Sequence, residues 1–341
     1  MTNGNDAVRV ASVGLSDYLR RYAFPGLSSS VNCEFVGVAG RDPAKIRTAL
    51  GEQFTGTIYS SYEAAIESPD IDAIYITLPN CLHKEWSLRA VAAGKHVLCE
   101  KPLALRAADV DEIASAAKAA NVVVLEALMY RHHPQWSYVA ELLGAHAIGQ
   151  VRSVVASYAY LDTSYTGPRF SPQLGGGALA MVGSYPIDTA VLAFSTMPTA
   201  ATAFAQPAAS TGVDGTTSAI LEFATGHAIM TVSTEAYDNQ HVRIVGSDGL
   251  IDIPVPINVP ATSRASVIVQ SPRYATSERA DFGPSDQFKL QFEHFARVVR
   301  GLQPPLIPLD ESRRYAEVIE AVARSARSDG IRIAVGASST E

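Results

Sequence analysis

The chain has 341 residues, of which 47% are hydrophobic and 18% charged, and its formal net charge is −7 at pH 7. A chain of this length normally folds into two domains, each with its own hydrophobic core. The acidic balance is spread along the sequence without a basic block, which argues against nucleic acid or an anionic membrane as the main partner and favours a small molecule.

The start of the chain, residues 1–6, is polar and acidic, and no apolar run approaches the roughly 18 residues of a membrane span. These features predict a cytoplasmic protein. The three cysteines, Cys33, Cys81 and Cys99, lack metal-ligand spacing, so we expect buried free thiols and neither a disulfide framework nor a metal site.

Strands and helices alternate in the first part of the chain. The pattern predicts strands at 8–13, 34–39, 71–76, 96–99 and 122–125, and helices at 43–50, 62–67, 83–93 and 107–120. A further helical pattern follows Gly14 and should be interrupted by Pro25. This alternation predicts an α/β Rossmann domain with a doubly wound parallel sheet over residues 1–128.

The first strand leads into Gly14, Leu15, Ser16, Asp17 and Tyr18, as in the first βα turn of a dinucleotide fold. Such a turn uses three glycines for tightness, approach to the pyrophosphate and helix packing. Only the first is present. Ser16 is small enough for the second role and could contact phosphate, whereas Leu19 is bulky at the third.

The second predicted strand ends at Gly40, Arg41 and Asp42, where a Rossmann fold reads the cofactor ribose. An acidic residue there binds the ribose hydroxyls of NAD, whereas Arg pairs with the 2′-phosphate of NADP. Asp42 can also be the N-cap of a helix beginning at Pro43. We favour phosphate binding for Arg41 and the cap for Asp42.

The strand at 96–99 delivers Glu100, Lys101 and Pro102 to its carboxyl end, which is where ligands bind in open α/β sheets. Burial can tune the amine of Lys101 for proton transfer. A solvated turn closed by Pro102 is the alternative interpretation of this triplet.

After residue 150 strands follow one another through short loops. They are predicted at 151–161, 199–206, 218–223, 228–234, 242–245 and 266–270, with hairpin signals at 226–227 and 247–249. Residues 129–341 should therefore form an α+β domain with a large open, mainly antiparallel sheet. A helix at 183–194 would cover one face, and the other face would be wet or would form a homodimer or homotetramer.

Two helices at 286–302 and 310–328 close the chain, and we expect them to pack back toward the Rossmann domain. Phe288, Phe292 and Phe295 recur at helical spacing and should belong to the core.

The second dense stretch runs from Gly175 through Gly177 to Asp188. Consecutive glycines let a backbone pass close to another group, and Met181 and Tyr185, four residues apart, share a helix face. A simple loop before a helix, with Tyr185 in the core, would explain the same residues.

These motifs together resemble the Gfo/Idh/MocA oxidoreductases over nearly the whole chain. The matching segments are AGKHVLCEKPLA at 93–104, LPN at 78–80 with His83, EALMYRHHPQ at 126–135, Arg169, and GGGALAMVGSYPID at 175–188. The resemblance implies that Lys101 is the catalytic acid/base and Tyr185 its partner. It also implies that Arg41, Leu78, Pro79, Asn80, His83, Glu100 and Arg169 contact the cofactor. We further expect the substrate to contact Arg131 and, on the open sheet, Tyr237, besides Lys101 and Tyr185.

Two departures from the family pattern stand out. The glycine-rich turn is reduced to GLSDYL at 14–19, and Met181 replaces the Asp that usually begins the D-x-G-x-Y motif. The second change removes a carboxylate expected near the nicotinamide and the substrate.

The sequence therefore predicts an NADP(H)-dependent oxidoreductase, with NAD as the alternative cofactor, that acts on a sugar-derived carbonyl or hydroxyl, as a ketosugar or nucleotide-sugar ketoreductase does. Alternatives within the enzyme class are an aldose 1-dehydrogenase and a dihydrodiol dehydrogenase. A non-catalytic, cofactor-sensing regulatory protein is the alternative from another class, and retention of Lys101 and Tyr185 favours the enzyme.

Overall fold

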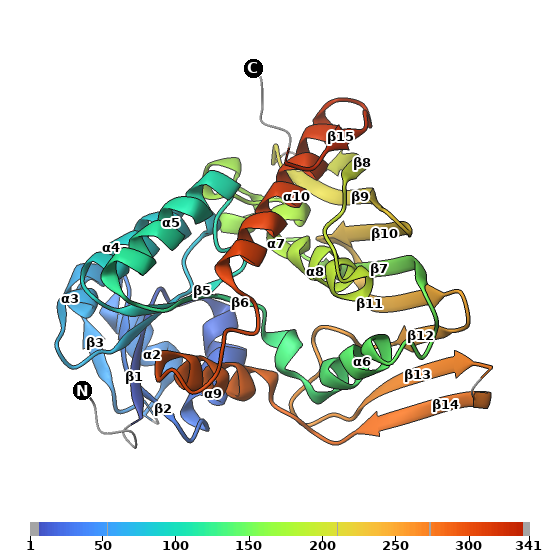
Figure 1. Cartoon of the computed structure of the whole chain (residues 1–341). Coiled ribbons are helices and arrows are strands. Elements are labelled where there is room, and N and C mark those ends of the chain that lie inside the picture. The colour runs from blue at the N-terminus through green and yellow to red at the C-terminus, as the bar shows by residue number, and fades with distance from the viewer. Residues whose placement is uncertain (1–6, 53, 210, 273, 337–341) are drawn as a thin grey trace. The chain divides into compact units, whose positions relative to one another are not determined.

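The computed structural model describes residues 7–52, 54–209, 211–272 and 274–336, so the polar start at residues 1–6 lies outside the described chain. The chain forms two compact units, coloured along the sequence in Figure 1. Of the described residues, the first unit contains those within 7–104, 108–132 and 286–313, and the second contains those within 105–107, 133–285 and 314–336. Segment 286–313 was expected in the C-terminal domain but clusters with the first unit.

The first unit is built on a six-stranded sheet in the order β3-β2-β1-β4-β5-β6. Every neighbouring pair is parallel, and this order is that of dinucleotide-binding folds, so the predicted doubly wound sheet is confirmed. The strands are β1 (Val8–Val13), β2 (Cys33–Ala39), β3 (Thr57–Tyr59), β4 (Ala73–Ile76), β5 (His96–Glu100) and β6 (Val124–Ala127). The helices are α1 (Phe24–Ser28), α2 (Pro43–Leu50), α3 (Tyr62–Glu67), α4 (His83–Ala92), α5 (Ala107–Ala120) and α9 (Gln287–Val299).

Helix α9 belongs with this unit because its apolar side chains are buried against it. Phe292 and Phe295 are fully buried, as predicted, and the ring of Phe292 lies 5.2 Å from that of Tyr75 in β4. Asp286 caps the helix by accepting hydrogen bonds from the N–H groups of Phe288 and Lys289.

Pro25 does not interrupt the first helical segment, contrary to the prediction. A π-helical turn, Leu19–Ala23, runs directly into α1, and Pro25 lies in the first turn of that helix. Proline is favoured in the first turn of an α-helix, where its fixed φ suits the helical backbone.

The second unit is built on a nine-stranded sheet in the order β14-β13-β12-β11-β7-β10-β9-β8-β15. Only β7 and β10 pair in parallel in the described part of this sheet, so the prediction of a mainly antiparallel sheet is confirmed. The strands are β7 (Val151–Leu161), β8 (Ala200–Pro207), β9 (Asp214–Phe223), β10 (Gly226–Ser233), β11 (Glu235–Gly246), β12 (Leu250–Ile253), β13 (Ala265–Ser271), β14 (Tyr274–Phe282) and β15 (Ile333–Ala334).

Helix α8 (Ser184–Phe194) packs against β7 and β10 and covers one face of this sheet. Helices α6 (Pro134–Gly144), α7 (Ala178–Val182) and most of α10 (Leu309–Arg327) complete the unit. The helical stretch 172–194 is long and apolar enough to cross a membrane, yet 78% of its most apolar window is buried inside the protein. Such burial is typical of a core helix, so the stretch is weak support for a membrane span.

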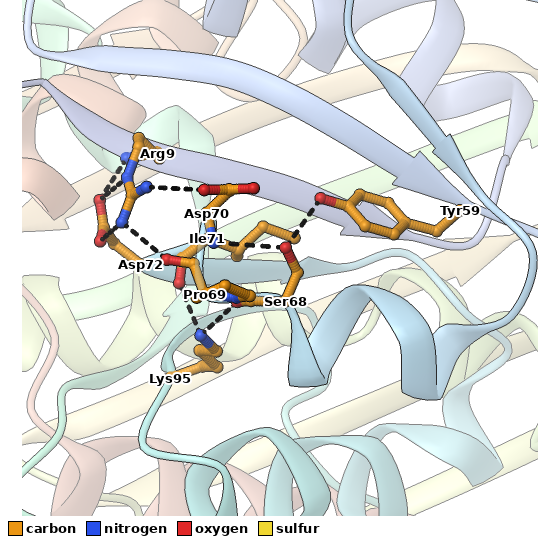
Figure 2. A network of polar contacts seen from close by, with 8 residues as sticks. All are labelled: Arg9, Tyr59, Ser68, Pro69, Asp70, Ile71, Asp72 and Lys95. Atoms are coloured by element: carbon orange, nitrogen blue, oxygen red, sulfur yellow. Dashed lines mark hydrogen bonds and ion pairs between the residues drawn. The ribbon is translucent and has the colours of Figure 1, made fainter.

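A polar network closes the amino-terminal edge of the parallel sheet, opposite the edge where the motifs lie (Figure 2). Arg9 in β1 donates to both carboxylate oxygens of Asp72, just before β4, at 2.7 and 3.1 Å. Lys95, just before β5, donates to the carbonyl oxygens of Ser68 and Ile71, each at 2.7 Å. These contacts tie the starts of three neighbouring strands together.

Candidate active site

The strand order brings most predicted cofactor residues to the carboxyl-terminal edge of the first sheet. Gly14 follows β1, Arg41 follows β2, Leu78 follows β4 and Lys101 follows β5. Loops at this edge bind dinucleotides in doubly wound folds. Arg169, Tyr185 and Tyr237 belong to the second unit, so the predicted site residues form two groups, described here one after the other.

The first βα turn is tight at Gly14 and polar at Ser16. Gly14 has a φ of 96°, and a Cβ there would lie 3.0 Å from the side chain of Leu78. The Ser16 hydroxyl accepts the N–H of Leu19 at 3.0 Å and so begins the helical segment. Leu19 is fully buried. The turn thus keeps one essential glycine, and the predicted bulk of Leu19 is accommodated in the core.

Asp17 and Tyr18 point to different partners. Asp17 is exposed and pairs with Arg20 at 3.3 Å, whereas the Tyr18 hydroxyl lies 3.4 Å from the sulfur of Met129. Leu15 packs with Ile46 and Val38 in a small core under β2.

Asp42 is the N-cap of α2, as favoured from the sequence. Its side chain accepts the N–H groups of Ala44 and Lys45, each at 3.1 Å, and the hydrogen bond from Lys45 is the main cause of its lowered pKa. Arg41 beside it is exposed. Its charge reaches the phenol of Tyr62, whose pKa is raised by burial and only partly lowered by Arg41. The cap therefore engages Asp42, and the exposed Arg41 lies beside it, two residues after the end of β2.

Lys101 lies at the carboxyl end of β5 and is 9% exposed. Its neighbours are held from both sides. The Tyr75 hydroxyl donates a short hydrogen bond to the Glu100 carboxylate, and the Leu103 N–H donates to Oε1 of Glu126 at 3.1 Å. Burial raises the pKa of Glu100, and the charge of Lys101 opposes that shift. The strand end is thus a fixed, buried turn, and the solvated-turn interpretation is wrong.

His83 differs from its predicted role as a direct cofactor contact. The side chain is 1% exposed, with Nδ1 2.7 Å from the carbonyl oxygen of Pro102 and Nε2 2.8 Å from that of Leu78. Both ring nitrogens are engaged by backbone, so neither is free for the cofactor. Pro79 and Asn80 lie between Leu78 and His83, with Asn80 buried.

Tyr185 is the centre of the second group and is 3% exposed on α8. Its ring lies 5.2 Å from that of Tyr158 in β7. The amide of Asn258 donates a short hydrogen bond to the Tyr158 hydroxyl, and Gln240 Oε1 accepts the Asn258 N–H at 2.8 Å. A polar chain therefore runs from β11 to the aromatic pair.

Two of the three glycines before α7, Gly176 and Gly177, lie where a side chain would meet a neighbouring group. Gly177 has a φ of 109°, and a Cβ there would lie 2.1 Å from a carboxylate oxygen of Asp214. That carboxylate accepts the Leu179 N–H at 2.8 Å and so caps α7. Met181 lies on α7, half-buried, one turn before Tyr185. Asp188 does not replace the lost carboxylate, because it is fully buried and accepts a hydrogen bond from the Tyr315 hydroxyl.

Three other predicted residues lie in varied surroundings. Arg169 donates to Asp162 at 2.7 Å, with its guanidinium 5.5 Å from the ring of Tyr160. Tyr237 is 87% exposed where the pairing of β11 with β7 shifts register. Arg131 is half-buried in a short 3-10 turn after β6.

From the sequence, Tyr158 and Asn258 carry no predicted role and Glu126 only begins a matching segment, although all three make positioning contacts. Tyr158 and Glu126 are polar side chains at inward positions of strands, where apolar residues are usual. A polar residue at such a position indicates a buried hydrogen bond, so both could have been found from the sequence. Asn258 lies in a loop 100 residues from its partner, so no local pattern marks it.

Comparison with known proteins agrees with this fold. A model described as an oxidoreductase family with an NAD-binding Rossmann fold matches residues 8–128, and the GFO/IDH/MocA C-terminal domain matches residues 136–252. A crystal structure of a 3-ketoreductase from Actinomadura kijaniata, in complex with NADP and TDP-benzene, is similar with a TM-score of 0.86 at 29% identity. The match covers 94% of this chain and 98% of that one.

Relatives of similar length show the same likeness in sequence. A dTDP-3,4-didehydro-2,6-dideoxy-alpha-D-glucose 3-reductase of Actinomadura kijaniata is 32% identical over 94% of this chain and 96% of its own length. The D-xylose 1-dehydrogenase (NADP(+)) 2 of Haloferax volcanii is 33% identical over 86% of this chain and 90% of its own length. With both family models matched and both sheets in place, the chain belongs to the Gfo/Idh/MocA oxidoreductase family.

Proposed function

We propose that this oxidoreductase is an NADP(H)-dependent reductase of sugar-derived ketones, of the ketosugar or nucleotide-sugar ketoreductase type. The observation that carries the proposal is the buried lysine at the carboxyl end of β5, whose neighbours Glu100 and Leu103 are each fixed by a hydrogen bond from or to a buried side chain. A lysine held in this way suits proton transfer, because its amine can be tuned to exchange a proton near neutral pH.

The residues at the carboxyl edge of the first sheet fit a dinucleotide. Gly14 lacks a side chain where a Cβ would press on Leu78, so the backbone stays open to a phosphate. Arg41 is exposed beside the capping Asp42, which supports binding of the 2′-phosphate that distinguishes NADP from NAD. When bound, the reduced nicotinamide supplies the hydride.

Lys101 and Tyr185 supply the proton chemistry in this proposal. The Lys101 ammonium gives its proton to the substrate oxygen during reduction and takes one back during oxidation, while the Tyr185 hydroxyl donates a hydrogen bond to the same oxygen. Both groups act where charge develops in the transition state. A positioned acid/base of this kind is worth roughly 10²- to 10⁴-fold in rate.

The substrate class is supported by the relatives. Solved structures of the Actinomadura kijaniata 3-ketoreductase with TDP-benzene and NADP include variants with a lysine replaced by alanine and a tyrosine replaced by phenylalanine. We propose that Arg131 and Tyr237 contact the sugar. We also propose that the sugar binds against the ring of Tyr185, which is held in place by Tyr158, Asn258 and Gln240.

The direct test is kinetic, with NADPH and a panel of ketosugars, nucleotide ketosugars, aldoses and dihydrodiols. Lys101→Ala and Tyr185→Phe should each lower kcat by roughly 10²- to 10⁴-fold while the thermal stabilisation by NADP is retained. The kcat of the double variant should be little lower than that of the less active single variant, because the effects of groups that act as a unit are not additive.

Full activity of Lys101→Ala on the true substrate would refute the mechanism. Turnover of aldoses or dihydrodiols, with no ketosugar reduced, would replace the substrate class with that of an aldose 1-dehydrogenase or a dihydrodiol dehydrogenase. If NADP binds but no substrate in the panel turns over, the reductase proposal itself is overturned.

We also propose that the protein acts in the cytoplasm as a homodimer or homotetramer assembled through the open face of its second sheet. Ile229 in β10 is paired with Ile220 in β9 and with Val155 in β7, and all three side chains are more than 40% exposed. A row of aliphatic side chains across three strands is typical of a protein interface.

A further inference from the structure

His83 joins two loops that leave neighbouring strands. It begins α4, and strands β4 and β5 are paired in parallel, so the loop with Leu78 and the loop with Pro102 leave the same edge of the sheet side by side. The imidazole lies between them, 2.8 Å from the Leu78 carbonyl oxygen and 2.7 Å from that of Pro102. Leu78 belongs to the loop assigned to the cofactor, and Pro102 follows Lys101 directly.

The two carbonyl contacts determine how many nitrogens of the His83 ring must carry a proton. A carbonyl oxygen only accepts hydrogen bonds, and a neutral imidazole carries a single N–H. Neutral His83 can therefore bind one of the two carbonyls and must turn a lone pair toward the other. Only the imidazolium, with an N–H on each nitrogen, donates to both at these distances.

The electrostatic surroundings make this second proton a labile one. Burial lowers the pKa of His83 and the charge of Lys101 acts in the same direction, whereas the two carbonyl hydrogen bonds raise it. Lys101, at the end of β5, is the charged side chain that acts on the ring from the elements packed around it. Burial outweighs the two carbonyls, so the pKa of His83 is lowered and the ring loses its second proton more readily than a free imidazole does.

We propose that His83 is a positioning residue that couples the cofactor loop to the catalytic loop, and that it holds both loops together only as the imidazolium. This role of His83 rests on the proposed function, in which Lys101 is the acid/base. His83 touches neither substrate nor nicotinamide in this role and acts through the backbone on either side. Loss of the proton leaves one loop tied and the other released, so cofactor binding and the placement of Lys101 weaken together as pH rises.

The test has one arm that needs no substrate. The wild-type protein, labelled with ¹⁵N at histidine, is titrated from about pH 5 to about pH 9, the range in which histidines change charge. NADP-induced thermal stabilisation is measured over the same range. We expect both His83 nitrogens to carry protons at the acidic end and one at the alkaline end, with the stabilisation by NADP falling across the same transition.

His83→Gln is the informative variant, and His96→Gln is its matched control. The glutamine amide donates at every pH, so the pH-dependent fall should disappear and the stabilisation should be smaller throughout. His96 is a half-buried histidine at the opposite end of β5, where Nδ1 accepts the Val123 N–H at 2.9 Å. Its variant should lower thermal stability yet follow the wild-type pH dependence, since it ties neither loop.

Kinetics separates the two proposals. With the ketosugar that the wild type reduces, His83→Gln should lower kcat by roughly 10- to 100-fold, as misplacement of a catalytic group by about 1 Å does. A neutral ring across the whole titration, or a wild-type pH dependence in His83→Gln, overturns the role of His83 even if the enzyme is an active reductase. Protonation linked to NADP binding, in a protein without reductase activity, overturns the proposed function instead. If His83→Gln does not fold, the titration of the wild type decides alone.

Discussion

At the scale of single residues, the residues on either side of Lys101 are held by side chains from distant parts of the chain. Lys101 was expected at a strand end and is found there, but the side chains that fix its neighbours come from other strands and from helix α4. Glu126 lies 23 residues from the Leu103 N–H that it binds, and His83 lies 19 residues from the Pro102 carbonyl. Pairings of this kind depend on strand order, which sets which loops become neighbours, and no local periodicity encodes it.

Cofactor choice should depend on Arg41, because it is exposed at the tip of β2 while Asp42 is engaged as a helix cap. We expect NADP to raise the melting temperature more than NAD at equal concentration. Arg41→Asp should abolish this preference, because a carboxylate repels the 2′-phosphate and binds ribose hydroxyls. Asp42→Asn keeps a cap and should leave the preference unchanged. Stronger stabilisation by NAD in the wild type would contradict the role given to Arg41.

The residue that departs from the family motif offers a second experiment. Met181 lies one turn before Tyr185, so Met181→Asp places a carboxylate on the helix face that carries the tyrosine. In the proposed mechanism this negative charge stabilises the protonated Lys101, and the pH optimum of turnover should move upward. Met181→Asn is the uncharged control. An unchanged or lower optimum in Met181→Asp would show that position 181 does not act on the proton donor.

At the scale of elements, periodic patterns predicted many of the core strands and helices but missed the interior strand β12, the helix α6 and the edge strand β14. The predicted helix 43–50 and strand 151–161 match α2 and β7. Strand β14 was missed because it is the edge strand of its sheet and its sequence is rich in charge, so no alternation of apolar residues marks it. Strand β11 was predicted at a third of its length because its first half is exposed.

The network at the amino-terminal edge of the parallel sheet should make stability depend on acid. Burial tends to raise the pKa of Asp72, but hydrogen bonds from Arg9 outweigh it, so the pKa of Asp72 is lowered. A carboxylate with a lowered folded-state pKa stabilises the protein above its unfolded pKa of about 4, and this contribution is lost as pH falls through the folded pKa.

Asp72→Asn should therefore reduce the free energy of unfolding in urea by roughly 1 kcal/mol at neutral pH, and by less as the pH falls below about 4. Asp70→Asn is the control, since Asp70 is 83% exposed and 3.8 Å from Arg9, and it should change little. An equal loss for Asp72→Asn at neutral and acidic pH would argue against the charge of Asp72 as the cause.

At the scale of the whole molecule, the open sheet should decide the state of assembly. Ile229→Asp puts a charge in the middle of the aliphatic row formed with Val155 and Ile220, so we expect it to yield monomers. Val31→Asp, at an 81% exposed position of the first unit, should keep the wild-type mass. Light scattering at micromolar concentration measures both, and a monomeric wild type would contradict assembly through this face.

Helix α9 has a consequence for modularity. Every strand of the parallel sheet is encoded before residue 132, but α9 completes that unit from residues 286–313. A gene fragment ending at residue 132 would leave bare the apolar surface that Phe292 and Phe295 cover, and we expect it to aggregate. The contiguous segment up to residue 132 should therefore not fold as an independent nucleotide-binding domain. Joining residues 286–313 to residue 132 through a flexible linker should produce a domain that folds independently.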